Sequence, residues 1–235
     1  MNKELTFRQG LRETLPTIFG YLGIGIAFGM IGRASGLNLW LIFLLSCLVY
    51  AGSAQFIMVG LMAVQSPILS IILAVFLVNS RMILMSMTTA RYFKNEKMWK
   101  NIWLGTLLTD ESFALGMNKQ NYTDGILSFP WFNAVNLFSY ASWVFATLIG
   151  AILGSFIPNP SQFGLEFAVI AMFIGLLYLQ VINDRTKKLS LQLIVIGLVC
   201  LLFYVGLIFI PANLLILLVT LVCCGLGMVV KHVFF

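Results

Sequence analysis

The feature that constrains this chain most is an apolar run over residues 39–64 that carries polar residues at its middle. The run has 26 residues, which as one straight helix would measure about 39 Å. A bilayer hydrocarbon core of about 30 Å needs only about 20 residues. Gly52 and Ser53 are poor helix formers, and the Gln55 amide needs hydrogen-bond partners in lipid. The run therefore predicts either a strongly tilted helix or one that breaks near its middle.

A broken helix at this depth would have functional consequences. It leaves backbone N–H and C=O groups without helical partners, and membranes tolerate such groups only where they line a polar cavity. Secondary transporters bind small polar substrates at helices of this kind. We therefore expect a substrate site in this stretch. The candidate binding residues that it supplies are Tyr50, Gly52, Ser53, Gln55 and Phe56.

The composition supports a membrane protein. Hydrophobic residues make up 60% of the chain and charged residues 9%, whereas charged residues reach about 25% in soluble globular domains. No short strands of alternating polarity, typical of membrane barrels, are visible. We expect an all-α polytopic membrane protein of seven or eight hydrophobic segments, some broken or re-entrant, in a single permease domain over residues 1–235.

The expected segments can be read in order along the chain. Residues 1–14 predict an interfacial N-terminal segment, and Thr14 before Pro16 predicts the start of the first spanning helix. Asn79-Ser80-Arg81 interrupts the third apolar run, and the last two runs predict a closing hairpin. The eight apolar runs cover residues 15–31, 39–64, 68–90, 99–117, 129–156, 166–182, 189–210 and 212–230.

The basic residues favour a particular topology. If all eight runs cross the membrane and the N-terminus is cytoplasmic, eight basic loop residues lie inside and five outside. If instead one of the runs 39–64 and 68–90 turns back, and 99–117 does so as well, twelve lie inside and only Arg33 outside. The second arrangement fits the positive-inside rule far better. Which of the two earlier runs turns back stays open.

Arg81 and two acidic residues complete the candidate site. A charged side chain in an apolar segment costs several kcal/mol unless it is paired or hydrated. We therefore assign Arg81, with Asn79, to substrate binding or gating, the alternative being a fixed ion pair with Asp110 or Glu111. Those two acids point about 100° apart on a helix. We expect one to carry a proton and the other to pair with Arg81 or lie at the interface.

Other chemistries find little support. The four cysteines, Cys47, Cys200, Cys223 and Cys224, lie in apolar runs without metal or disulfide spacing. His232 is the only histidine, which argues against metal sites and hydrolases. The basic residues are scattered over loops, which disfavours nucleic-acid binding. We expect no cofactor, no metal and no enzymatic activity.

Three motifs, in order, resemble the signatures of AzlC-type permeases, the large subunits of two-component branched-chain amino acid exporters. They are Tyr50-Ala51-Gly52-Ser53-Ala54-Gln55-Phe56, Asn79-Ser80-Arg81 and Thr109-Asp110-Glu111-Ser112-Phe113-Ala114. Gly164-Leu165-Glu166-Phe167-Ala168 is similar too, although an aspartate is commoner at the position of Glu166.

The resemblance implies a function that the residues alone do not name. It implies proton-coupled export of branched-chain or similar apolar amino acids across the cell membrane, with a small AzlD-type membrane subunit as partner. From the residues alone, a channel or facilitator for a small neutral or anionic solute remains the alternative, with Arg81 as its selectivity charge.

Overall fold

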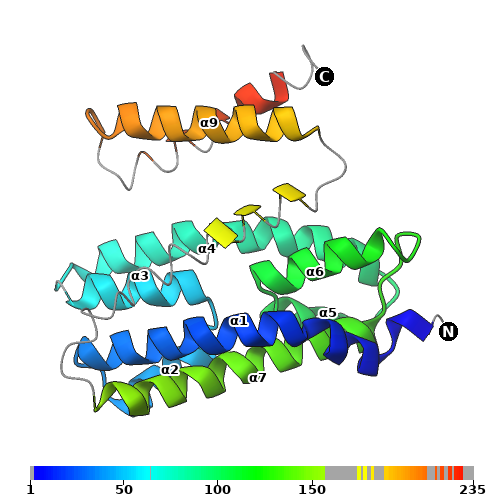
Figure 1. Ribbon diagram of the computed structural model, residues 1–235, viewed down its shortest axis with the longest axis horizontal. Helices are drawn as coiled ribbons and strands as arrows, with labels where there is room; N and C mark the ends of the chain where they lie inside the picture. Colours follow the sequence, from blue (N-terminus) through cyan, green and yellow to red (C-terminus); the bar gives the residue numbers. More distant parts are fainter. Residues whose placement is uncertain are drawn as a thin grey trace. The chain divides into compact units, whose positions relative to one another are not determined.

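The computed structural model describes residues 3–63, 65–156 and 188–210, together with short stretches at 174–175, 177–178, 181–182, 215, 218–219, 222–223 and 225–229. These residues form helices joined by turns, without a strand among them (Figure 1). The chain divides into two compact units, Met1–Ile174 and Gly175–Phe235. The all-α prediction is confirmed. Glu166 and His232 lie outside the described residues.

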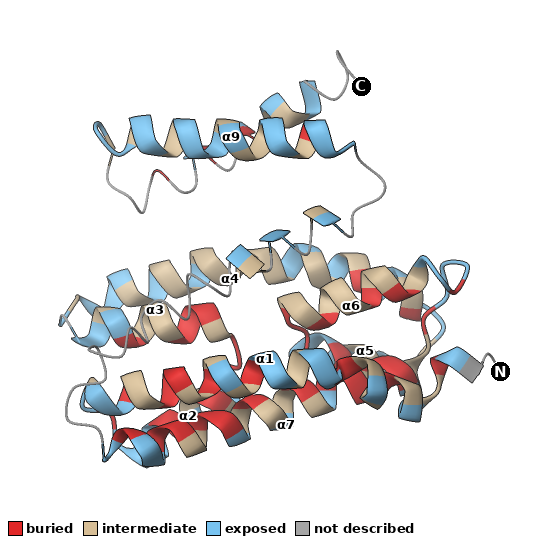
Figure 2. Cartoon of the chain, in the orientation of Figure 1, coloured by how far each residue is buried: buried red, intermediate tan, exposed pale blue. Residues whose placement is uncertain are grey.

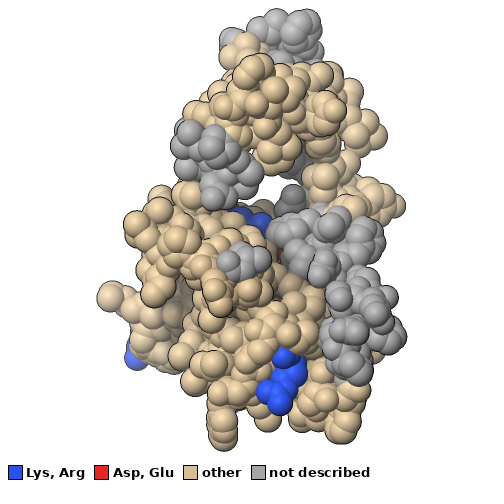
Figure 3. Space-filling model, turned by 90° about the vertical axis from the view of Figure 1, so that its left-hand side faces the viewer, with Lys and Arg blue, Asp and Glu red and all other residues tan. Residues whose placement is uncertain are grey.

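Within the described part of the chain, four helices are long and apolar enough to cross a membrane. They are α1 (Phe7–Ala34), α4 (Ile68–Ala90, extended by the 3₁₀ turn η2 at Arg91–Phe93), α7 (Phe129–Gly154) and α9 (Leu189–Gly206). Large apolar side chains are exposed along them, and charged side chains are sparse on the face in Figure 3. This surface suits a lipid environment, where apolar groups need no water.

Helices α1 and α7 form the core of the first unit, and buried residues gather along both in Figure 2. Their backbones touch at glycines. A Cβ atom on Gly29 would collide with the backbone of Thr147 and Ala151, and one on Gly150 with the backbone of Ile26. Small residues at such contacts allow the close helix packing that holds membrane helices together.

The first helix starts earlier than predicted. The start expected at Thr14 and Pro16 is wrong, because α1 begins at Phe7, where the Thr6 side chain accepts a hydrogen bond from the Gln9 backbone N–H at 3.3 Å. A proline inside a helix costs about 3 kcal/mol. Packing offsets this cost, since the α-carbon of Gly10 lies directly against the Trp131 carbonyl on α7.

Two of the apolar runs are broken near their middles. The first forms α2 (Leu39–Leu48) and α3 (Gly52–Ala63). The second forms α5 (Met98–Thr106) and α6 (Asp110–Gln120). At 1.5 Å per residue each piece measures only about 14–18 Å, half of a membrane crossing. We call residues 49–51 elbow 1 and residues 107–109 elbow 2. The predicted break in residues 39–64 is confirmed.

Both broken runs turn back to the side from which they start (Figure 1). The hydroxyl of Tyr92, before α5, donates to Gln120 Oε1 at the end of α6. Ser128 Oγ, before α7, donates to the Leu5 carbonyl at 2.5 Å. The N-terminal segment, the end of α4 and both ends of the α5–α6 hairpin therefore share one face, which we call the N face. The α2–α3 hairpin starts and ends at the opposite face, because α1 and α4 each cross once.

The predicted interruption at Asn79-Ser80-Arg81 is wrong. Helix α4 continues through these residues, and the Ser80 hydroxyl is satisfied by the Leu77 carbonyl of its own helix at 2.7 Å. The two candidate runs are thereby distinguished: 39–64 turns back and 68–90 crosses. The free-energy cost of placing the Arg81 charge in an apolar segment is offset by hydrogen bonds and an ion pair to other side chains, and α4 does not break there.

The second unit is described in part. Leu215, Val219 and Cys223 are buried together, and Leu198 and Leu202 of α9 pack against them. The spacing of four residues between the buried side chains is that of one helical face. These contacts agree with the predicted closing hairpin.

Candidate functional site

The two elbows meet halfway along α1, α4 and α7 (Figure 1). Between them lies a cavity of ≈ 20 Å³, about the space that one water molecule needs. The site is therefore too small in this structure to hold an amino acid, and this is what we call its closed state. Residues from both elbows, from the first turns of α3 and α6 and from three spanning helices line it: Tyr21, Tyr50, Ala51, Gly52, Ser53, Met82, Thr109, Asp110, Glu111 and Trp143.

Elbow 1 contains a strained residue. Tyr50 has φ 36°, in the left-handed region that costs a bulky side chain of order 1–3 kcal/mol. Its ring is buried and lies edge-on to Tyr140, with 4.8 Å between centroids. Helix α3 starts directly after this bend, so the N–H groups of its first turn, including those of Gly52 and Ser53, have no acceptor within the helix.

Elbow 2 is formed by a capping box. The Thr109 side chain accepts from the Ser112 N–H at 3.3 Å, and the Ser112 hydroxyl accepts from the Thr109 N–H at 3.0 Å. This reciprocal pair starts a new helix at Asp110. Asp110 and Glu111 therefore occupy its first turn, where the helix dipole favours negative charge.

Arg81 connects α4 with both elbows. Its guanidinium forms an ion pair with Asp110 Oδ2 at 2.7 Å and donates to Ser53 Oγ at 3.0 Å. The Arg81 side chain is 36% exposed and that of Asp110 15%. The alternative role considered for Arg81, an ion pair with an acid of α6, is thus present in this closed state.

Glu111 has a different partner. The Tyr21 hydroxyl, on α1, donates to Glu111 Oε2 at 2.5 Å and lies 2.8 Å from Thr109 Oγ1. Asp110 and Glu111 thus take separate partners, as their angular separation predicts. Both nevertheless line the same cavity, because elbow 2 places the start of α6 beside it. Of the two roles expected for these acids, the pairing with Arg81 falls to Asp110.

Three predicted site residues lie behind the cavity rather than in it. Gln55 is fully buried, and its Oε1 accepts from Trp143 Nε1 at 2.9 Å. Phe56 lies edge-on to Phe28 at 5.2 Å. Asn79 is half-buried on α4 and is absent from the lining. The structure brings together Tyr50, Gly52, Ser53, Arg81 and the two acids, with Gln55, Phe56 and Asn79 around them.

The sequence does not predict four of the lining residues, Ala51, Met82, Tyr21 and Trp143, and the last two are the polar ones. Each of these two comes from a spanning helix without a local polar motif, and only the fold places it against the elbows. The indole of Trp143 closes one wall, 3.0 Å from where a Cβ atom on Gly52 would lie. Thr109 does carry a sequence signal, because the spacing Thr109-x-x-Ser112 is that of a helix N-cap.

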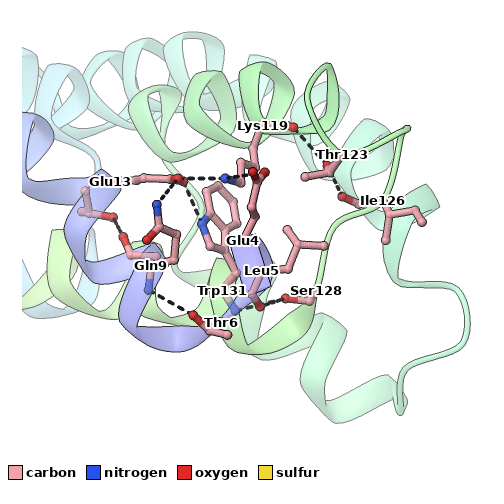
Figure 4. A network of polar contacts seen from close by, with 12 residues as sticks. Glu4, Leu5, Thr6, Gln9, Glu13, Lys119, Thr123, Ile126, Ser128 and Trp131 are labelled. Carbon is pink, nitrogen blue, oxygen red and sulfur yellow. Dashed lines mark hydrogen bonds and ion pairs between the residues drawn. The ribbon is translucent and has the colours of Figure 1, made fainter. Parts of the chain in front are cut away.

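A cluster of charges lies at the far end of α6, on the N face (Figure 4). Lys119 Nζ lies 2.8 Å from Glu13 Oε1 and 3.7 Å from Glu4 Oε2. The Trp131 indole N–H and the Gln9 amide also donate to Glu13, each at 2.9 Å. This N-face charge cluster ties α6 to α1 and α7.

Comparisons with known proteins agree with this picture. The AzlC protein family matches residues 16–157. An uncharacterized membrane protein of Helicobacter pylori is 31% identical over 83% of this chain and 84% of its own length. The inner membrane protein YgaZ of Escherichia coli is 30% identical over 64% of this chain and 62% of its own. The branched-chain amino acid transport protein AzlC of Bacillus subtilis is 28% identical over 76% and 69%.

No solved structure matches the chain. The family match covers more than half of the chain, and within it lie both elbows, Arg81 and the two acids. The four long apolar helices fit the membrane proteins among the relatives. This chain belongs to the AzlC family of membrane proteins.

Proposed function

We propose that this protein exports branched-chain or similar apolar amino acids across the cell membrane by alternating access. The Bacillus subtilis relative is named for branched-chain amino acid transport. The observation that carries the proposal is the closed cavity between two broken hairpins, with Arg81 bridging Ser53 and Asp110 at its edge. Secondary transporters bind substrates at broken helices of this kind.

The site has the groups that a zwitterion requires. The substrate carboxylate binds to Arg81 and to the free N–H groups at the start of α3, since helix N-termini attract anions. The ammonium group binds to the carboxylates of Asp110 and Glu111. The apolar side chain packs against Met82 and the surrounding aromatic rings.

Substrate binding opens the closed site by exchanging partners. Asp110 now occupies the guanidinium of Arg81 at 2.7 Å, and a substrate carboxylate competes for the same planar fork. When the carboxylate replaces Asp110, α4 loses its ionic link to elbow 2. Elbow 2 is then able to move relative to elbow 1, which enlarges a cavity that holds about one water molecule.

Glu111 is the group that couples export to the proton gradient. Asp110 is balanced by Arg81, whereas Glu111 is hydrogen-bonded by neutral groups, the Tyr21 hydroxyl among them. A carboxylate without a cation beside it changes its protonation with its surroundings more readily than one in an ion pair. Proton release from Glu111 follows when elbow 2 opens to the other side of the membrane.

The proposed partner is a small AzlD-type membrane subunit.

The N face is cytoplasmic in this proposal. In the first unit, Arg91, Lys94, Lys97 and Lys100 lie in or beside the loop on the N face, and Arg33 is at the opposite end. The positive-inside rule assigns the basic face to the cytoplasm. A topology reporter inserted at Asn95 should report the cytoplasm; an external location would overturn this orientation.

Efflux of radiolabelled leucine from preloaded vesicles, with the partner subunit present, tests the function. We expect saturable efflux that an imposed proton gradient accelerates. Vesicles that lack the small subunit should show slower efflux, and equal rates would remove the partner from the proposal. Flux that does not saturate and ignores the gradient would instead support a channel. Within the first unit, the small volume of the cavity favours the carrier, because a channel needs a continuous open path between the two faces.

A further inference from the structure

A larger cavity lies on the other side of elbow 2. It is a crevice of ≈ 240 Å³ between the second half of α4 and α5, twelve times the ≈ 20 Å³ of the site. Consecutive residues of elbow 2 line the two cavities: Leu108 lines the crevice and Thr109 lines the site. Elbow 2 is thus the wall between a large cavity and the closed site.

The crevice leads from the N face to this wall. On α4 it is lined by Ser86, Ala90 and Phe93, which lie on one helical face because they are spaced by four and three residues. Met82, one turn earlier on that face, lines the site. The lining of α4 therefore runs without a gap from the N-face end of the helix to the residues beside Arg81.

Helix α5 and elbow 2 supply the facing wall in the same way. Asn101, Gly105 and Leu108 line the crevice, at positions i, i+4 and i+7 of one face. Asn101 lies near the N face and Leu108 at the elbow. Two continuous stripes thus border the crevice along its whole length.

The chemistry of the crevice fits a molecule with both an apolar and a polar part. Met87, Phe93 and Leu104 make its walls mostly apolar. Asn101 donates through Nδ2 to the Phe93 carbonyl at 3.2 Å, but its Oδ1 is buried without a partner among the described residues. A lipid tail offers nothing to this acceptor, whereas the ammonium group of an amino acid can donate to it.

We infer that this crevice is the access path between the N face and the site, and that its apolar walls select amino acids with branched aliphatic side chains. The inference rests on the proposed function and deepens it. Leu108 contacts the substrate side chain as elbow 2 moves, and Asn101 holds the ammonium group on the way in. The substrate reaches Arg81 through this crevice, and elbow 2 moves as the substrate carboxylate displaces Asp110.

Filling the crevice tests the path. A Cβ atom on Gly105 would meet no atom within 4 Å, so Gly105→Leu adds bulk to the crevice without a clash. The matched control is Gly60→Leu, because Gly60 is also an exposed helical glycine with no atom within 4 Å and lines neither cavity. We expect Gly105→Leu to slow leucine export about tenfold and alanine export about twofold, because a narrowed pocket discriminates by side-chain size. The control should export both at wild-type rates.

Thiol labelling tests the crevice without relying on transport. In a variant whose four cysteines are replaced by alanine, Gly105→Cys and Gly60→Cys are exposed to a small charged methanethiosulfonate. We expect position 105 to react, leucine to slow that reaction, and position 60 to stay unreactive in lipid. Failure of position 105 to react, or no protection by leucine, would mean that lipid fills the crevice and would overturn the inference.

The outcomes separate the two proposals. If wild-type protein exports leucine and Gly105→Leu exports it equally well, the access path is wrong and the exporter stands. If wild-type protein with its partner does not move amino acids at all, the proposed function is wrong and the access path falls with it. Correct folding of Gly105→Leu is checked by its expression level in the membrane and its gel-filtration profile, both of which should equal those of Gly60→Leu.

Discussion

The two broken hairpins have the same architecture but are fastened differently. The α2–α3 hairpin contains no charged residue and is held by neutral hydrogen bonds to α7. Gln55 Oε1 accepts from the Trp143 indole at 2.9 Å, and the Cys47 carbonyl accepts from the Tyr140 hydroxyl at 3.1 Å. The α5–α6 hairpin also makes neutral hydrogen bonds to α7, among them one from Asn136 Nδ2 to the Leu104 carbonyl at 3.2 Å, but it has in addition ion pairs at both ends of α6.

The difference separates a fixed hairpin from a movable one. Neutral hydrogen bonds buried in apolar surroundings have no competing partner in the membrane, so the α2–α3 hairpin stays in place. The ion pairs of Asp110 with Arg81 and of Lys119 with Glu13 can be exchanged for substrate or water. We expect the α5–α6 hairpin to move and the α2–α3 hairpin to remain on α7.

Among the variants that test this comparison, loss of Arg81 should have the largest effect on export. Arg81→Ala removes the link between α4 and both elbows and leaves Asp110 without its cation. We expect export of leucine from vesicles to fall below detection, with Arg81→Lys retaining only a small fraction, because lysine lacks the planar fork. Adding Asp110→Asn to Arg81→Ala should recover thermal stability but not export. Wild-type export by Arg81→Ala would remove this residue from the mechanism.

Substitutions of the two acids of the α5–α6 hairpin should have different effects on proton coupling. Glu111→Gln keeps the hydrogen-bonding shape beside Tyr21 but cannot release a proton. We expect this variant to exchange leucine across the membrane while losing its response to an imposed proton gradient. Asp110→Asn should slow export and retain the response. Leucine efflux from vesicles, measured with and without an imposed proton gradient, tests this division of roles. An identical response to the gradient in the two variants would contradict it.

The N-face charge cluster should hold the movable hairpin closed. Lys119→Gln removes the cation beside Glu13 while keeping a polar side chain, and we expect the protein to lose about 2 kcal/mol of stability in thermal unfolding. The α5–α6 hairpin should also exchange its amide hydrogens faster. Lys100→Gln is the control, because Lys100 pairs with Glu96 within the adjoining turn. Unchanged exchange in Lys119→Gln would show that the cluster does not restrain α6.

Gln55→Leu should have the smallest effect on export. It leaves the Trp143 indole N–H without its acceptor and should destabilise the protein by about 1–3 kcal/mol. Because Gln55 does not line the cavity, we expect leucine to be exported with an unchanged KM. A raised KM would show that the Gln55 amide contacts the substrate. The α2–α3 hairpin would then take part in binding at this residue as well as holding its place on α7.

The sequence predicts the breaks better than it predicts the site. Residues 39–64 are too long for one crossing and carry Gly52 and Ser53 at the middle, so local chemistry marks the bend. The strongly polar Thr109-Asp110-Glu111-Ser112 marks the second one. The continuity of α4 through Arg81 is not predictable in this way, because the partners that balance the charge are distant in sequence: Ser53 and Asp110.

Long-range packing explains the remaining differences. Tyr21 joins the site because α1 lies along α7 and passes elbow 2, and nothing beside Tyr21 in the sequence indicates that contact. Pro16 lies inside α1 for the same reason, since close packing of α1 on α7 outweighs the local cost of a proline. Pattern reasoning finds local bends and misses contacts between distant segments.

The glycine contact between α1 and α7 has a consequence for the shape of the transport route. At Gly29 and Gly150 the two backbones touch, and no side chain separates them. Neither water nor a solute can pass along that seam. In the proposed mechanism, α1 and α7 therefore form one rigid wall of the transport route through the first unit, and the substrate passes on the side of this helix pair where the elbows lie.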